Sequence, residues 1–195
     1  MMSAFSAAYK EPYKGVFTPK AGEYCASRFT ADNQWYRAQV QTVSKGGVFK
    51  VLYIDYGNSE TVSQDRLRPL DLQFSIKSLK PQAIQVQLAH MILPSPEDDY
   101  FLESLEMLKS LTEGKVLKAK FLNPVHPAQV ILTDTVNINV ALLSAGLAYL
   151  EKRVLRLKSS ALSQELQELL DSQAEAQRNH LKLWRYGDFT ADEDD

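Results

Sequence analysis

The chain has 195 residues, a mass of 22.0 kDa and a formal net charge of −2, so it can bury one large core or two small ones. With 24% charged residues of both signs, it lacks the global basic excess that draws proteins to nucleic acids or anionic membranes. The lone cysteine, Cys25, excludes an internal disulfide, and no apolar run approaches the roughly 18 residues of a membrane span, so we expect a soluble intracellular protein.

The first third of the chain reads as a short helix followed by a small all-β domain. Residues 1–8 favour helix, and Pro12 closes that segment. Short alternating apolar patterns joined by polar or glycine-containing turns then predict strands at residues 22–29, 35–43, 48–56 and 59–62. In the second of these strands, Tyr36 is expected on the buried face and Arg37 on the polar face. So many short strands with tight turns favour a small barrel.

After Pro69 the pattern changes to alternating strands and helices. Ser95 and Pro96 form a typical helix start, and an apolar stripe containing Leu105 follows them. The tail after residue 190 is acidic. Strands are expected at residues 83–91, 115–122, 129–133 and 147–150, and further helices at residues 139–145 and 160–180.

The most informative segment is VFKVLYIDYGN at residues 48–58. Tyr53, Tyr56 and Asn58 converge there at the end of an apolar strand, and Asp55 lies between the tyrosines. Phe29 and the Trp35–Tyr36 pair form a second aromatic cluster upstream. Tyrosines around one polar side chain suit an alkylated cation, because a cation over aromatic faces gains roughly 0.5–2 kcal/mol for each good contact. In strict alternation Tyr53 and Tyr56 would face opposite sides, so the strand must bend or end near Asp55.

Several motifs resemble a known family. WYRAQV at residues 35–40 and VLYIDYGN at residues 51–58 resemble the Tudor domain. INVALLSAGLAYL at residues 138–150 and the later HLKLW are similar to the second half of a staphylococcal-nuclease fold. Together with the ending LWRYGDF, they resemble the C-terminal extended Tudor module of the Tudor staphylococcal nuclease family.

This resemblance implies a mixed β and α+β fold: a small Tudor β-barrel inserted into a partial staphylococcal-nuclease-like lobe of the OB-fold type. The implied divisions are an N-terminal helix and linker at 1–18, the Tudor barrel at 19–73, the nuclease-like lobe at 74–190 and an acidic tail at 191–195. The N-terminal side leaves no room for the strands that precede the barrel in this family. The lobe is then expected to lack them or to have an open sheet edge.

The resemblance also implies a function, the binding of peptides that carry symmetrically dimethylated arginine. Methylarginine keeps its charge but loses donors, so aromatic faces select it better than a carboxylate fork. Asp55 is expected to add long-range attraction. The alternative for the tyrosines is ordinary barrel core, and Trp35 is expected to be structural. By motif, the binding residues are Phe29, Tyr36, Tyr53, Tyr56 and Asn58.

The enzyme hypothesis is unfavourable for this stretch. A nuclease site of this fold needs clustered carboxylates for calcium, two arginines and a glutamate base, and most of these lie in the half of the fold that is absent here. Asp134 alone cannot hold a metal. His90, His126 and His180 lack ligand spacing. We therefore expect no catalytic residue, no metal and no cofactor in this segment.

The expected partners are proteins with symmetrically dimethylated Arg-Gly-rich tails, of the Piwi or Sm-like kind, within a larger RNA-regulatory scaffold. The competing hypothesis is an RNA-binding module that uses the nuclease-like OB lobe, with the basic run Lys152, Arg153, Arg156 and Lys158 at the phosphates. No membrane partner is expected. The expected location is the cytoplasm, with the nucleus as a second compartment.

Overall fold

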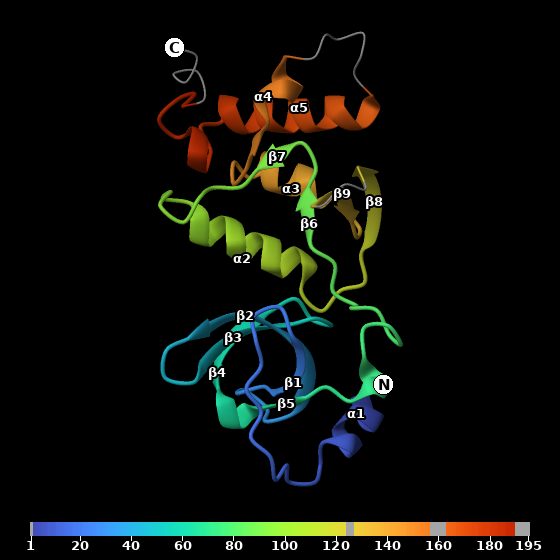
Figure 1. The fold of residues 1–195 in the computed structure, drawn as a ribbon. Helices are drawn as coiled ribbons and strands as arrows, with labels where there is room; N and C mark the ends of the chain where they lie inside the picture. The colour runs from blue at the N-terminus through green and yellow to red at the C-terminus, as the bar shows by residue number, and fades with distance from the viewer. Residues whose placement is uncertain (1, 124–126, 157–162, 190–195) are drawn as a thin grey trace. The chain divides into compact units, whose positions relative to one another are not determined.

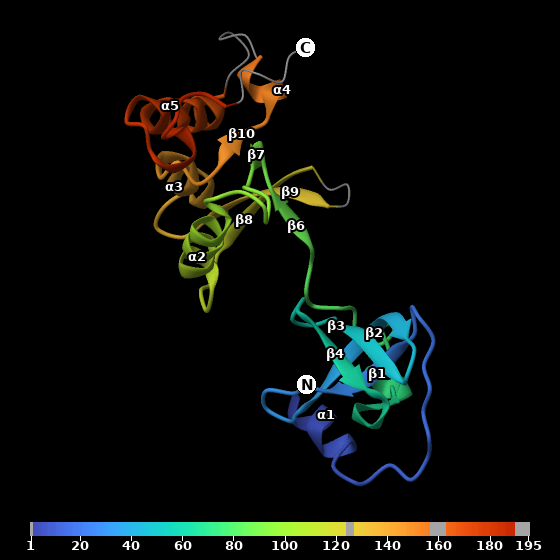
Figure 2. The same ribbon diagram turned by 90° about the vertical axis from the view of Figure 1, so that its left-hand side faces the viewer.

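The computed structural model describes residues 2–123, 127–156 and 163–189. The chain forms two compact units, Met1–Gln85 and Val86–Asp195, which Figure 1 and Figure 2 show from two directions. The domain limits expected from the sequence stay a prediction. Lys158, His126 and the acidic tail lie outside the described residues.

The first unit is a short helix and a bent antiparallel sheet. The strands follow the order β4-β3-β2-β1-β5, and the register of β2 against β3 shifts between Val40 and Thr42. Such an irregularity increases the local bend of a sheet, and the strands curl accordingly (Figure 1). The elements are α1 (Met2–Ala8), β1 (Tyr24–Arg28), β2 (Trp35–Ser44), β3 (Val48–Tyr53), β4 (Ser59–Ser63), η1 (Gln64–Arg66), β5 (Leu67–Pro69) and η2 (Leu72–Phe74).

The predicted mixed fold class is confirmed, with one structural detail added. Strands β4 and β5 are the two ends of the hydrogen-bonded order, and the 3-10 turn η1 connects them. The sheet is therefore open at this seam rather than closed by a β4–β5 ladder. Its inner face carries the core residues Cys25, Ala38, Val40, Phe49, Val51, Tyr53, Val62 and Leu67.

Helix α1 packs on the same unit through a separate aromatic cluster. The Tyr9 and Trp35 rings stack with their centroids 5.6 Å apart, and Phe5 contacts Phe74 edge-on at 4.8 Å. The Arg68 guanidinium lies 4.3 Å from the centroid of Trp35. Trp35 is therefore a structural residue, as expected, and it faces away from the tyrosines of the first core.

Arg37 lies on the face opposite the core residues Ala38 and Val40, as the alternation predicts, but it is buried there, with only 2% of its surface exposed. Its guanidinium donates to both carboxylate oxygens of Asp55, at 2.8 Å from Nε and 2.5 Å from Nη2. It also donates to the main-chain carbonyls of Phe74, Leu79 and Lys80 at 3.1, 2.6 and 3.2 Å. A buried cation is tolerated when it is paired and fully hydrogen-bonded, so the prediction that this face exposes Arg37 to solvent is wrong, although the face itself was predicted correctly.

The second unit contains two small sheets and the longer helices. Strand β6 pairs parallel with β9, β8 pairs antiparallel with β9, and β7 pairs with β10. The predicted strand at residues 83–91 is instead two strands, because His90 takes a left-handed conformation with φ 65° and turns the chain between them. The elements are β6 (Val86–Leu88), β7 (Met91–Ile92), α2 (Phe101–Thr112), β8 (Lys118–Asn123), β9 (Ala128–Thr133), α3 (Ile138–Ser144), β10 (Tyr149–Leu150), α4 (Lys152–Leu155), α5 (Gln164–Arg178) and η4 (Lys182–Trp184).

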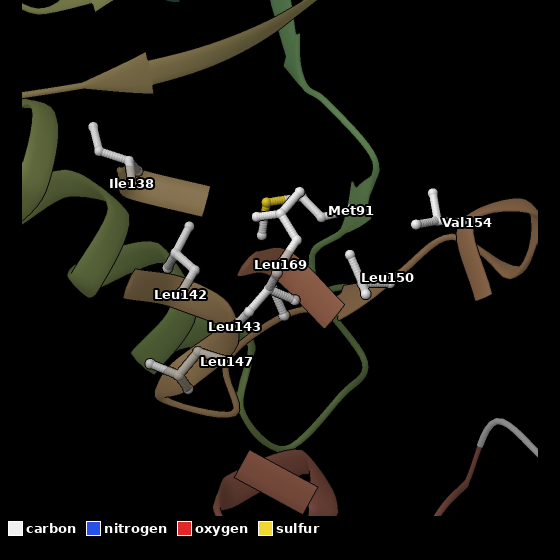
Figure 3. Packing of buried hydrophobic residues seen from close by; sticks show 9 residues of the cluster. Met91, Ile138, Leu142, Leu143, Leu147, Leu150, Val154 and Leu169 are labelled. Atoms are coloured by element: carbon white, nitrogen blue, oxygen red, sulfur yellow. The ribbon is translucent and has the colours of Figure 1, made fainter. Parts of the chain in front are cut away.

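The core of the second unit lies between α3, α5 and the β7–β10 pair. Its buried members surround Leu169 of α5, as Figure 3 shows. The side chain of Gln173 accepts the Leu150 N–H at 2.7 Å, and Asn139 donates to the Ala89 carbonyl at 2.9 Å. These two buried amides satisfy main-chain groups of Leu150 and Ala89 at the ends of short strands, and a buried main-chain polar group left without a partner would be costly.

Two helix predictions need correction. Helix α2 begins at Phe101 rather than at Ser95, because the Ser95 N–H donates to Asp98 Oδ2 at 2.6 Å and the Asp98 N–H donates back to the Ser95 carbonyl at 2.9 Å. That closed turn precedes the helix. Leu105, expected in the buried stripe, is 48% exposed. Helix α5 is capped by Ser163, whose hydroxyl accepts the Leu166 N–H.

Among the described residues, no helix is both long enough and apolar enough to cross a lipid bilayer.

The Arg37–Asp55 pair generates the first testable prediction. We expect Asp55→Ala to lower the free energy of unfolding by about 3 kcal/mol, because it leaves a buried guanidinium without its counter-charge. Urea denaturation measures this change. The control is Lys109→Ala, which removes an ion pair whose side chains are both 65% exposed and should cost about 0.5 kcal/mol or less. Equal stability of the two variants would contradict a structural role for the buried pair.

Candidate functional site

The structure brings all five predicted binding residues to one cavity of about 240 Å³ in the first unit. Two loops frame this cavity: residues 29–34 between β1 and β2, and residues 54–58 between β3 and β4. The cavity is lined by Phe29, Asp32, Tyr36, Tyr53, Tyr56 and Asn58. We call this set the aromatic pocket.

The four rings of the aromatic pocket meet edge to face. The ring centroids are 5.2 Å apart for Phe29 and Tyr53, 5.8 Å for Tyr36 and Tyr53, and 5.2 Å for Tyr36 and Tyr56. The corresponding interplanar angles are 79°, 80° and 87°. Rings at right angles form the walls of a box instead of filling it by stacking, so their negative faces are available to a cation.

The turn after β3 explains how two tyrosines three positions apart face one cavity. Strand β3 ends at Tyr53, and the N–H groups of Tyr56 and Gly57 both donate to the Tyr53 carbonyl, at 3.1 and 2.7 Å. Gly57 has φ +88°, which glycine adopts without steric cost. The predicted break in the strand near Asp55 is confirmed, and it returns Tyr56 and Asn58 to the side of Tyr53.

Tyr53 belongs both to the pocket and to the core. It is 1% exposed, and its hydroxyl bonds to Ser27 at 3.2 Å and donates to Glu60. Burial, and then the bond to Glu60, raise the pKa of Tyr53 well above its ordinary value. Tyr56 is 58% exposed. Tyr53 is therefore the floor of the pocket and Tyr56 is an outer wall. The alternative in which Tyr53 packs in the barrel core is correct, although its ring also lines the pocket.

Glu60 of β4 connects the floor to the first loop. Besides the Tyr53 hydroxyl, its carboxylate accepts the Thr30 N–H at 3.3 Å and the Thr30 hydroxyl at 2.6 Å. From the other side, Arg66 donates to the Phe29 carbonyl at 2.8 Å and to Asn33 Oδ1 at 3.0 Å. These bonds hold the loop that carries Phe29, so the pocket is built by residues from outside it as well.

Asp32 is a pocket residue that the sequence patterns did not single out. Its Oδ2 accepts the Tyr36 hydroxyl at 2.6 Å, and its Oδ1 accepts the Gln34 N–H at 2.8 Å. These two bonds lower the pKa of Asp32, and the same hydroxyl bond raises the pKa of Tyr36 to about 12. In the sequence Asp32 sits in a polar turn between two strands, where no local spacing rule indicates which side chain it contacts.

Asp55 has a different place from the one expected. It does not line the aromatic pocket. Both of its carboxylate oxygens face Arg37, its side chain is 7% exposed, and Oδ1 also accepts the Gln82 N–H at 3.2 Å. The long-range attraction expected of Asp55 does not fit this arrangement, because its charge is buried and paired. Asp32 is the carboxylate at the pocket.

The part of the second unit that the structure describes offers no comparable constellation for metal chemistry. Across residues 2–123, 127–156 and 163–189, no three His, Cys, Asp or Glu side chains gather in a way that could hold a metal ion. Asp134 instead lies 3.9 Å from the Lys115 ammonium. In the basic run, Arg153 pairs with Glu151 and donates to the Gln129 side chain at 3.2 Å.

A family pattern, curated relatives and solved structures all relate this chain to proteins with Tudor domains. The sequence pattern of the Tudor domain matches residues 1–90. Staphylococcal nuclease domain-containing protein 1 of Drosophila melanogaster is 37% identical over 208 residues, covering 99% of this chain and 21% of that protein. The chain thus spans about a fifth of the length of such curated relatives.

Two solved structures extend the similarity to the whole fold. The extended Tudor domain of Drosophila melanogaster Tudor-SN (p100) superposes with a TM-score of 0.82 and 33% identity, over 94% of this chain and 85% of that one. The human TDRD1 extended Tudor domain, in complex with a symmetrically dimethylated peptide, gives a TM-score of 0.67 and 30% identity, over 77% and 76%. Because these matches include both the bent sheet and the strand–helix unit, the chain belongs to the extended Tudor domain family.

Proposed function

We propose that this chain is a reader of symmetrically dimethylated arginine in peptides and carries out no catalytic step itself. The observation that carries the proposal is the box of four edge-to-face rings around a 240 Å³ cavity, with Asp32 and Asn58 as its polar lining. The human TDRD1 domain with its symmetrically dimethylated peptide supports the same chemistry.

The pocket suits this ligand for physical reasons. A dimethylated guanidinium is planar and keeps its positive charge, so it can lie against ring faces while its methyl groups bury apolar area. The Asn58 amide can accept a remaining guanidinium N–H without a second full charge. Asp32 places a negative charge at the pocket, which complements the cation.

The wider role is also a proposal. The chain spans about a fifth of its curated relatives, so the module is proposed to serve a larger RNA-regulatory scaffold. Its partners would be proteins with methylated Arg-Gly-rich tails, of the Piwi or Sm-like kind. The proposed location is the cytoplasm, with the nucleus as a second compartment.

Removing one pocket wall should weaken binding without unfolding the unit. We expect Tyr56→Ala to reduce the affinity for a symmetrically dimethylated peptide about five- to thirtyfold, or roughly 1–2 kcal/mol, since Tyr56 is an exposed wall. Asn58→Ala should cost about 1 kcal/mol through one hydrogen bond. Isothermal titration calorimetry measures both. Tyr186→Ala is the matched control, because that tyrosine is 87% exposed and lies in the second unit.

Tyr53 requires a milder substitution than alanine. Tyr53→Ala would open a cavity in the core and destabilise the unit by about 3–5 kcal/mol, so lost binding would not report on recognition. Tyr53→Phe keeps the ring and removes the hydroxyl bonded to Ser27 and Glu60.

If Tyr56→Ala and Asn58→Ala both bind as tightly as the parent chain, the pocket is not the binding site.

The protonation states of the pocket predict a flat pH profile. The pKa of Tyr36 is raised to about 12 and that of Asp32 is lowered from 3.8, so neither group titrates between about pH 5 and 9. Affinity at fixed ionic strength should be constant across that range. It should fall as the pH drops through the pKa of Asp32, because protonation removes the carboxylate charge. Fluorescence anisotropy with a labelled peptide tests this, and a strong transition near pH 6.5 would contradict it.

RNA binding by the second unit is the competing outcome. Affinity for single-stranded RNA would fall steeply with added salt, because phosphate contacts release counterions. It would also survive Tyr56→Ala and weaken with Arg156→Ala. Anisotropy titrations of labelled RNA and of the methylated peptide, each at two salt concentrations, distinguish these outcomes.

A further inference from the structure

The two dimethylarginine isomers differ in where their N–H groups lie. In the symmetric isomer each terminal nitrogen carries one methyl group and one hydrogen. In the asymmetric isomer one terminal nitrogen carries two methyl groups and no hydrogen, and the other carries two hydrogens. A pocket with one acceptor for each terminal nitrogen can therefore bond both nitrogens of the symmetric isomer, but only one nitrogen of the asymmetric isomer.

The aromatic pocket has acceptors on both of its framing loops. Asn58 comes from the turn between β3 and β4, and Asp32 comes from the loop between β1 and β2. The remaining lining residues are Phe29, Tyr36, Tyr53 and Tyr56, which are aromatic. The hydroxyls of Tyr36 and Tyr53 donate their hydrogens to Asp32 and Glu60, and their neutral oxygens are weaker acceptors for a cation's N–H groups than a carboxylate is.

Asp32 is held in place and retains acceptor capacity. Its two carboxylate oxygens offer about four lone-pair sites. The Tyr36 hydroxyl uses one site at 2.6 Å and the Gln34 N–H uses another at 2.8 Å, one on each oxygen. The Tyr36 bond thus joins this carboxylate to a wall of the pocket, and each oxygen can still accept a ligand N–H.

We propose that Asp32 is the second hydrogen-bond acceptor of the aromatic pocket and that, with Asn58, it selects symmetric over asymmetric dimethylarginine. This inference rests on the proposed function. Tyr36 has two tasks in this arrangement: its ring is a wall and its hydroxyl positions the selecting carboxylate.

The test is the ratio of the dissociation constants for two peptides of identical sequence, one with asymmetric and one with symmetric dimethylarginine. We expect Asp32→Asn to weaken binding of the symmetric peptide about tenfold and binding of the asymmetric peptide less, so that the ratio of the asymmetric to the symmetric dissociation constant falls. The substituted amide can keep its oxygen on the Gln34 N–H and turn its NH₂ toward the Tyr36 hydroxyl. The amide NH₂ group then faces the ligand's guanidinium N–H groups, and because both are donors no hydrogen bond forms.

Two further variants make the test specific. Glu11→Gln removes the same charge from an exposed position in the first unit that does not line the pocket, and it should leave the ratio unchanged. Tyr36→Phe keeps the ring and removes the hydroxyl that anchors Asp32, so the ratio should fall by a smaller factor. Circular dichroism and thermal melting show whether each variant is folded. If Asp32→Asn is not folded, the ratio measured with Tyr36→Phe decides whether Asp32 is the selecting acceptor.

The outcomes separate this inference from the proposed function. If the parent chain binds the symmetric peptide and the folded Asp32→Asn variant keeps the parent ratio, Asp32 is not the selecting acceptor, while the reader function stands. An unchanged ratio in Tyr36→Phe overturns the inference in the same way if Asp32→Asn does not fold. If the parent chain binds neither peptide, the proposed function itself fails.

Discussion

The buried ion pair of Arg37 and Asp55 holds the turn on which the aromatic pocket depends. Asp55 lies between Tyr53 and Tyr56, and Arg37 draws it inward through two hydrogen bonds of 2.8 and 2.5 Å. The Ile54 N–H donates to the Arg37 carbonyl at 3.1 Å, which fixes the same turn to β2. With the turn held from below, Tyr56 and Asn58 project to one side. The same guanidinium binds three carbonyls of residues 74–80, so the chain leaving the sheet is held as well.

A second set of polar contacts shapes the opposite side of the pocket. Glu60 connects Thr30 to the Tyr53 hydroxyl, Arg66 holds the Phe29 carbonyl, and Asp32 holds the Tyr36 hydroxyl. Each of these bonds joins a pocket residue or its loop to a charged side chain, and such bonds are stronger than those between neutral groups. The aromatic walls are therefore preorganised, which reduces the ordering cost of binding a ligand.

The division of roles between Tyr53 and Tyr56 follows from burial. Tyr53 fills the core of the bent sheet and presents its ring to the cavity, whereas Tyr56 is more than half exposed at the rim. A site that shares its floor with the core has limited freedom to move, since packed interiors resist small displacements. Selectivity is then expected to come from the rim, where Asp32, Tyr56 and Asn58 lie.

Local patterns in the sequence were sufficient for four strands of the first unit, though not for the short β5, and they singled out Tyr53, Tyr56 and Asn58 at the end of one of those strands. The alternation of apolar and polar residues and the glycine of YIDYGN act over a few positions, so they could be recognised without the fold. The resemblance to the Tudor family then placed Phe29 and Tyr36 beside Tyr53. Only the tertiary structure decided the roles of Arg37, Asp55, Asp32 and Glu60. Arg37 pairs with a residue 18 positions away and Glu60 with one 30 positions away, and no local pattern encodes which charge meets which partner across a folded sheet. For that reason a buried arginine looked like a surface residue and a paired aspartate looked like a free one.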